Sequence, residues 1–199
     1  MLMSGYFYND QPLRLSRTGT PSLWDDAALD SFRRFVRLGT TGADTELREI
    51  VQIAGPWVES TCSTTLAENT LVLEVDTDKL NSTDVDGNTY IDLPFGPVSS
   101  VASVAWDGGS ETSLTLDTKS RPERVMKPDS VPAGKTTLTV TYTAGHASWS
   151  ALSSQEQFAV MLGVSHFWHN REAVSNPAMT SVPFMLAYSF SQIDRSSLG

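Results

Sequence analysis

The chain has 199 residues, of which 40% are hydrophobic and 19% charged, which is typical of one globular domain with terminal arms and excludes a disordered chain. Its formal net charge of −9 argues against a surface that binds nucleic-acid phosphates. The single cysteine, Cys62, excludes an intramolecular disulfide. We expect a soluble protein, because the sequence shows neither a signal peptide nor an apolar run near the ~18 residues of a membrane span.

The N-terminal part combines an irregular arm with a helix. Residues 1–20 show no sustained hydrophobic period, so we interpret them as an arm that has room for a short edge strand around Gly5–Tyr8. A helix is predicted over residues 22–38, with Ser22 and Asp25 as a capping box and Gly39 as the residue that ends it. Its apolar positions recur at helical spacing: Ala28, Leu29, Phe32, Phe35 and Val36.

Three arginines, Arg33, Arg34 and Arg37, lie in the last turn of this helix. Cations there complement the partial negative charge of the helix carbonyl end, and we interpret the arginines in this way. The alternative is a patch that binds phosphate.

A second helix is predicted over residues 44–61, with Thr41 and Asp44 as its cap. Its apolar face is formed by Leu47, Ile50, Val51, Ala54, Trp57 and Val58. Gly55-Pro56 predicts a kink or break, because Pro56 has no N–H for the bond to Gln52. We expect the two helices to form an antiparallel hairpin.

From about residue 66 to 145 the hydrophobic period changes to two. Leu71, Leu73 and Val75 alternate with polar or exposed positions, as do Leu138, Val140 and Tyr142. The intervening strands are predicted over 89–93, 98–106 and 113–116, with a polar connection at 76–88 and prolines at 122, 128 and 132. Five or six short strands indicate a small antiparallel sheet or sandwich inserted between helices.

A third helix is predicted over residues 153–171, with Ser153 and Glu156 as a capping box. Its expected apolar side consists of Phe158, Met161, Leu162, Ser165 and Trp168. A short helix over 182–188 and a polar tail over 189–199 follow. The predicted class is therefore α+β, with one domain over 21–188 in which a helical hairpin and C-terminal helices flank the sheet.

The strongest chemical candidate is the cluster of His166, His169 and Glu172, which share one helix face. Two histidines and a carboxylate can bind zinc, so a small metal-dependent hydrolase is one alternative function. The H-E-x-x-H spacing of zinc proteases is absent, however, and polar groups at a helix end are the simpler interpretation.

Other candidates are weaker. The acidic loop with Asp76, Asp78, Asp84 and Asp86 does not fit the register of a calcium-binding EF-hand, and Cys62 is expected to be a buried apolar residue. A glycan-binding β domain that uses exposed tryptophans, Trp106 and Trp149, is a second alternative function. We find no nucleophile or phosphate-loop motif, and we predict that the protein is not an enzyme and has no cofactor.

Four strings resemble the head–tail connector (adaptor) proteins of long-tailed bacteriophages and gene transfer agents. They are Asp44–Leu47 through Trp57–Thr61, Ile91–Pro94 with Gly96–Val98 and Ser100-Val101, Thr139–His146, and His169–Glu172 followed by Val182-Pro183. Together they cover about Ser22–Tyr188. Gly55-Pro56, the N-terminal arm and the loop at 76–88 depart from the family's pattern.

The resemblance implies a structural virion protein, made in the host cytoplasm, that forms a ring of about a dozen copies beneath the portal. Such a ring retains packaged DNA, which passes through its lumen without specific binding, and it offers a docking surface to a tail or neck completion protein. No membrane partner is expected. We predict that the short C-terminal helix contacts the portal or a neighbouring copy through Phe184, Met185, Leu186 and Tyr188.

Overall fold

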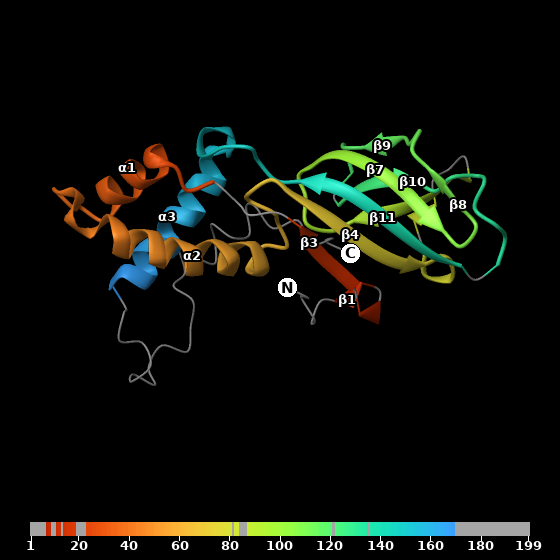
Figure 1. Cartoon of the computed structure of the whole chain (residues 1–199), viewed down its shortest axis with the longest axis horizontal. Coiled ribbons are helices and arrows are strands. Elements are labelled where there is room, and N and C mark those ends of the chain that lie inside the picture. Colours follow the sequence, from red (N-terminus) through yellow and green to blue (C-terminus); the bar gives the residue numbers. More distant parts are fainter. Residues whose placement is uncertain are drawn as a thin grey trace. The chain divides into compact units, whose positions relative to one another are not determined.

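The structure is a computed structural model that describes residues 7–8, 11–12, 14–18, 23–80, 82–83, 87–120, 122–134 and 136–169. Its contacts divide the chain into two compact units, each with its own hydrophobic core (Figure 1). We call residues 22–67 and 146–195 the helical unit, and residues 1–21, 68–145 and 196–199 the sheet unit. The helices and the small antiparallel sheets are formed mainly by different stretches of the chain, so the predicted α+β class is confirmed.

Helix α1 spans Asp26–Phe35 and begins later than predicted. Asp25 is its N-cap, because the Asp25 Oδ1 accepts a hydrogen bond of 2.9 Å from the Ala28 N–H. The predicted cap at Ser22 is therefore wrong. The residue before the helix supplies the acceptor that the first turn needs.

The C-terminal end of α1 also differs from the prediction. Arg37 has φ 61°, its N–H donates to the Arg34 carbonyl at 3.3 Å, and the Leu38 N–H donates to the Arg33 carbonyl at 2.8 Å. These two bonds form a Schellman motif, with arginine in the left-handed position. Gly39, the predicted C′ residue, lies two positions beyond it.

Helix α2 spans Asp44–Thr61, as predicted, after the short 3₁₀ turn η1 (Thr41–Ala43). Its N-cap is Ala43 without a side-chain hydrogen bond, so the predicted Thr41 and Asp44 cap is wrong. The helix continues through Pro56, so there is no break. Pro56 removes one backbone bond, while the fully buried Ala54 and Val58 hold the turns on either side in the core.

Helix α3 spans Ser154–His169 in the described part of the chain. Its predicted capping box is confirmed: the Ser153 Oγ accepts from the Glu156 N–H at 3.2 Å, and the Glu156 Oε2 accepts from the Ser153 N–H at 2.9 Å. The predicted end at 170–171 and the predicted helix at 182–188 lie outside the described residues.

The apolar side predicted for α3 is wrong. Its buried positions are Glu156, Ala159, Val160, Gly163 and Val164. The reason is a close contact with α2: a Cβ added at Gly163 would lie 3.3 Å from Val58 Cγ2 and 3.7 Å from Ala54 Cβ. Small residues allow this approach, and the larger side chains predicted for the core lie at its margin.

The sheet unit contains eleven strands in its described part. They are β1 (Phe7–Tyr8), β2 (Gln11–Pro12), β3 (Arg14–Thr18), β4 (Asn69–Asp76), β5 (Ser82–Thr83), β6 (Thr89–Leu93), β7 (Val98–Trp106), β8 (Gly109–Glu111), β9 (Leu116–Asp117), β10 (Glu123–Met126) and β11 (Thr137–Ala144). A five-stranded sheet has the order β3-β4-β11-β7-β8, and a four-stranded sheet has the order β5-β6-β10-β9. All of these pairs are antiparallel.

The first and last predicted strands match β4 and β11, whereas the region between β7 and β11 does not match. The expected strand over 113–116 is wrong, since β8 ends at Glu111 and β9 begins at Leu116. Strand β10 was not predicted, because prolines bracket its four residues. The segment predicted as an arm supplies β3, which pairs with β4 from Arg14↔Glu74 to Thr18↔Thr70.

The core of the sheet unit combines alternate residues of its longer strands. Leu71, Leu73 and Val75 of β4 are buried, in the alternation that the sequence predicts. Tyr142 of β11 is fully buried, and its hydroxyl donates to the Pro94 carbonyl. A buried phenol therefore keeps a hydrogen-bond partner inside the core.

The tight packing of Gly55 gives a stability prediction. A Cβ added there would lie 2.6 Å from Cζ2 of Trp24, whose ring packs against Phe32 and Trp149. We expect Gly55→Ala to lower the free energy of unfolding by about 1 kcal/mol, because the overlap outweighs the better helix propensity of alanine. Urea denaturation measures the change. The control is Gly39→Ala, where an added Cβ has no neighbour within 4 Å, and a loss as large as that of Gly55→Ala would contradict the explanation.

Candidate functional site

A chain of polar contacts in the helical unit joins the two places where the chain passes to and from the sheet unit. Glu59, near the end of α2, is 5% exposed, and its Oε1 accepts a hydrogen bond of 2.8 Å from the Leu66 N–H. The Leu66 carbonyl accepts from the His146 N–H at 2.8 Å, and Ala67 forms a parallel bridge with His146. We call Glu59, Leu66, His146, Glu156 and Ser153 the polar clasp.

The second half of the polar clasp connects His146 to α3. The His146 Nε2 lies 3.3 Å from the Glu156 Oε1, and the Glu156 Oε2 accepts from the Ser153 hydroxyl at 2.8 Å. Burial would raise the pKa of Glu156, but hydrogen bonds from His146 and Ser153 outweigh it and lower the pKa to about 2. Glu156 is therefore a carboxylate at neutral pH and accepts the hydrogen bonds of the polar clasp.

The polar clasp is built to fix backbone positions. Each carboxylate in it accepts from a backbone N–H, and Glu156 also begins a helix. The Ser153 hydroxyl donates to the Glu156 Oε2 and accepts from the Glu156 N–H, so both of its contacts belong to the helix cap. We therefore assign the polar clasp a structural role.

The predicted metal cluster is not assembled by the described residues. His166 stacks on Trp57 with ring centroids 6.0 Å apart, and the His169 Nδ1 lies 2.8 Å from the Ser165 carbonyl. Glu172 lies outside the described residues. Within the described part of the chain, no three His, Cys, Asp or Glu side chains come close enough to hold a metal ion.

The aromatic and cysteine candidates pack into the two cores. Trp149 is 4% exposed and contacts Phe32 edge to face at 5.1 Å, so it is not available to a glycan. Trp106 packs partly buried against the sheet core and covers Gly109, where an added Cβ would lie 2.9 Å from its Cζ2. Cys62 is buried, as predicted.

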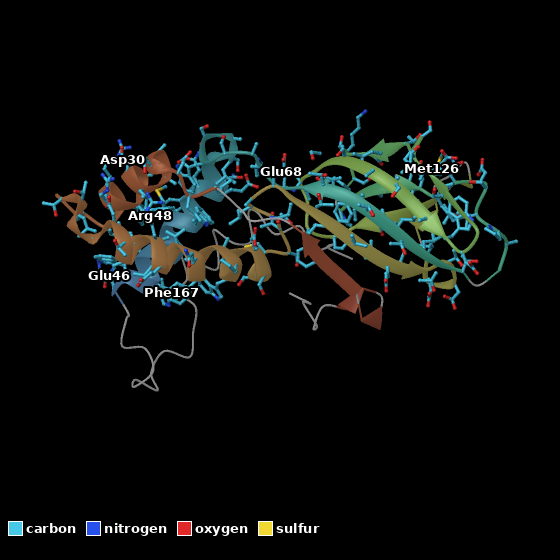
Figure 2. All side chains as sticks on the ribbon, viewed as in Figure 1. Asp30, Glu46, Arg48, Glu68, Met126 and Phe167 are labelled. Carbon is cyan, nitrogen blue, oxygen red and sulfur yellow. The ribbon has the colours of Figure 1, made fainter. Side chains whose placement is uncertain are left out.

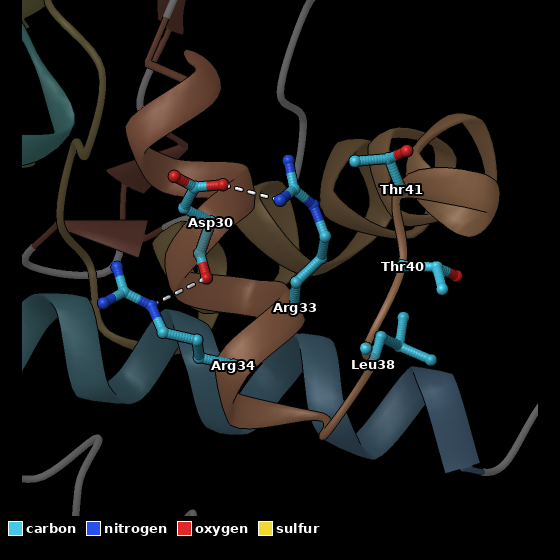
Figure 3. Close-up of a pocket in the computed structure, with 7 residues that line it drawn as sticks. Asp30, Arg33, Arg34, Leu38, Thr40 and Thr41 are labelled. Carbon is cyan, nitrogen blue, oxygen red and sulfur yellow. Dashed lines mark hydrogen bonds and ion pairs between the residues drawn. The ribbon is translucent and has the colours of Figure 1, made fainter.

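Two of the three arginines, Arg33 and Arg34, border a groove of about 370 Å³ at the end of α1 (Figure 3). Arg33 is paired with two acids: its Nη1 lies 2.6 Å from the Asp30 Oδ1 and its Nε lies 2.8 Å from the Asp44 Oδ1. Arg34 donates through Nε to the Asp30 carbonyl at 3.1 Å. Arg33 is thereby neutralised, which weakens the alternative of a phosphate-binding patch, while Arg34 and Arg37 are exposed.

A second charged cluster lies across three strands of the sheet unit. Arg124 of β10 forms an ion pair of 2.9 Å with Asp117 of β9 and covers the Tyr90 ring of β6 at 4.2 Å. Hydrogen bonds from the Ser120 hydroxyl, the Lys119 N–H and Arg124 hold the pKa of Asp117 well below its usual range. This cluster ties neighbouring strands together through side chains.

The predicted portal contacts lie outside the described residues; they are Phe184, Met185, Leu186 and Tyr188. No helix in the part of the chain that the structure describes is both long and apolar enough to cross a membrane.

Solved structures provide the comparison that decides the fold. No family model and no curated protein matches the chain. A chain in the neck of an empty gene transfer agent particle, computed with C6 symmetry, matches with TM-score 0.65 and 21% identity over 93% of this chain and 97% of that one. The protein has the fold of this neck component.

Two further structures give the same result. A chain in the virion of a native gene transfer agent particle matches with TM-score 0.65 and 20% identity, and one in a native neck computed with C12 symmetry matches with TM-score 0.64 and 18% identity. Both matches cover 93% of this chain and 97% of the other. The chain therefore shares its fold with chains of gene transfer agent necks and virions, which is the coarser part of the sequence resemblance.

Two of the strings named from the sequence each contain one residue of the polar clasp, but the sequence did not indicate the contacts of these residues. Glu59 belongs to the string that ends the second helix, and His146 ends the Thr139–His146 string. The available sequence signals were that Glu59 lies in an apolar stretch and that His146 follows the Ala-Gly at the end of a strand. Their pairing through Leu66 and Glu156 depends on contacts between distant parts of the chain, which spacing does not reveal.

The lowered pKa of Glu156 gives a pH prediction. Because the folded pKa is about 2 and the ordinary value is 4.5, the carboxylate stabilises the fold above pH 4.5, and this contribution is lost as the pH falls toward 2. We expect Glu156→Gln to cost about 2 kcal/mol near pH 7, and the difference from the unmodified chain should shrink between pH 4.5 and 2.

Thermal and urea unfolding across this pH range measure the effect. The matched control is Glu49→Gln, an exposed position on α2, which should change the free energy of unfolding by less than about 0.5 kcal/mol at each pH. A constant difference between Glu156→Gln and the unmodified chain down to pH 2 would contradict the assigned role of the carboxylate.

Proposed function

We propose that the protein is a head–tail connector, an adaptor that forms a ring beneath the portal of a phage-like particle. The ring helps to retain packaged DNA and offers the surface on which the tail or a neck completion protein docks. The protein is made in the host cytoplasm and acts in the neck of the virion. Its role is structural and involves no catalysis.

One observation carries this proposal: the fold is shared with a gene transfer agent neck chain along 93% of this chain and 97% of the other. The matched necks are computed with C6 and C12 symmetry. Rings with cyclic symmetry use head-to-tail contacts between identical copies.

The charge of the chain supports the same function. A net charge of −9 repels the DNA backbone, so the wall of a channel built from such copies lets DNA pass without holding it. About a dozen copies are proposed from the sequence resemblance and the symmetry of the matched necks.

The contacts at the candidate chemical residues favour this function over the alternatives. His166 and His169 contact Trp57 and the Ser165 carbonyl, and Trp149 is enclosed in the helical core. Metal analysis of the purified protein separates the adaptor from a zinc hydrolase. One zinc ion per chain would favour the hydrolase.

The first prediction concerns the particle. We expect the protein in purified particles as a ring between portal and tail, visible by cryo-EM. Deleting its gene should yield heads that package DNA but carry no tail and then lose the DNA. The reason is that both the docking surface and the seal are missing. Electron microscopy and a nuclease-protection assay measure these outcomes. Absence of the protein from purified particles would end the proposal.

The second prediction concerns the proposed portal contacts. The Phe184→Ser/Leu186→Ser double variant should lose binding to purified portal, because two apolar side chains of the expected contact become polar. The matched control, Ser189→Ala/Ser191→Ala, changes nearby positions without removing apolar surface and should bind normally. Pull-down with portal measures both. If the Phe184→Ser/Leu186→Ser variant binds portal normally, the portal contact lies elsewhere in the chain.

A further inference from the structure

Two large apolar side chains remain exposed in the described part of the chain, and both belong to the helical unit. Ile53 of α2 is 58% exposed, and Phe158 of α3 is 36% exposed. Single exposed apolar residues are common, but Phe158 contacts Phe35, whose chain neighbours Arg34 and Arg37 are exposed, and Ile53 shares one stripe of α2 with Pro56 and Glu49. These surroundings make them candidates for an interface.

Phe158 belongs to a surface that we call the basic aromatic surface, formed by Phe35, Phe158, Arg34 and Arg37. The rings of Phe35 and Phe158 meet edge to face at 6.0 Å, which joins α1 to α3. Arg34 and Arg37 are both exposed, and neither forms an ion pair with another residue in the described part of the chain. The surface therefore combines apolar rings with positive charge.

Ile53 belongs to a surface that we call the acidic aliphatic surface, formed by Glu49, Ile53 and Pro56. These residues are exposed and lie at positions i, i+4 and i+7 of α2, so they form one stripe away from the core. No ion pair joins Glu49 to another residue in the described part of the chain. This surface combines aliphatic atoms with negative charge.

The two surfaces belong to different elements of the helical unit, one to the contact between α1 and α3 and the other to α2. Figure 2 shows Asp30 on one side of this unit and Glu46 on the other. Arg34 follows Asp30 by one helical turn, and Ile53 follows Glu46 by two turns, so each belongs to the stripe of the labelled residue. Surfaces in this arrangement can be joined from copy to copy in a repeating series.

We propose that the basic aromatic surface of one copy docks on the acidic aliphatic surface of the next. Phe35 and Phe158 cover Ile53 and Pro56, and Arg34 and Arg37 face Glu49. This inference rests on the proposed ring and names its subunit contact. Contact between two identical surfaces would place arginine against arginine or glutamate against glutamate, so opposite charge selects the head-to-tail contact.

Cross-linking between single-cysteine variants tests this pairing. Ile53→Cys and Phe158→Cys chains of different tagged length are co-produced in particles and treated with a short bismaleimide. We expect a cross-linked dimer only when both variants are present, because the contact joins two different surfaces. The unmodified chain is the control, since Cys62 is buried and should not react.

A charge exchange tests the electrostatic part. Arg37→Glu should reduce the cross-linked and ring-assembled fractions about tenfold, and adding Glu49→Arg should restore them. Lys119→Glu, an equal charge reversal at an exposed position of the sheet unit, should have no effect. Thermal unfolding of each variant confirms that the fold is retained.

The outcomes separate the two proposals. Cross-links within one variant alone, or a neck ring without Ile53–Phe158 cross-links, would overturn the proposed contact and leave the adaptor function intact. A chain that is absent from the particle neck would overturn the adaptor function itself. Cross-links only in the mixture, with restoration by charge exchange, support the contact.

Discussion

The hydrogen bonds around Leu66 and His146 fix the two points where the chain leaves and re-enters the helical unit. Leu66 is held on one side by the buried Glu59 carboxylate and on the other by the His146 N–H. His146 in turn contacts Glu156, which belongs to the capping box at the start of α3. Because Glu59, Leu66 and Glu156 are buried, each of their polar groups requires its partner, and loss of one partner leaves another group unsatisfied. The paths of both crossing segments and the start of α3 therefore depend on one connected set of bonds.

Local signals in the sequence predict part of this fold well. Periodicity places α2 at its observed bounds, the Ser153 and Glu156 capping box starts α3, and alternation identifies β4. These features depend on neighbours within a few residues. The sequence alone is less informative where several local solutions compete, as at Asp25, which forms the cap that had been assigned to Ser22.

Other features depend on contacts between distant residues, which periodicity does not contain. The buried face of α3 is selected by the space that Ala54 and Val58 leave for Gly163, so small residues face the core and Phe158 does not. Strand β10 exists because β6 and β9 pair with it on both sides, despite the prolines around it. The candidate histidines suggested a metal site as one alternative, because helical spacing alone does not show that His166 stacks on the ring of Trp57.

The register between β4 and β11 has a mechanical consequence. Asn69 follows the segment that leaves the helical unit, Ala144 precedes the segment that returns to it, and the two residues are paired. Tension between the units therefore enters the sheet on two adjacent strands at the same level and in the same direction. The strands share the load without sliding past each other, so shear falls on their outer neighbours, β3 and β7.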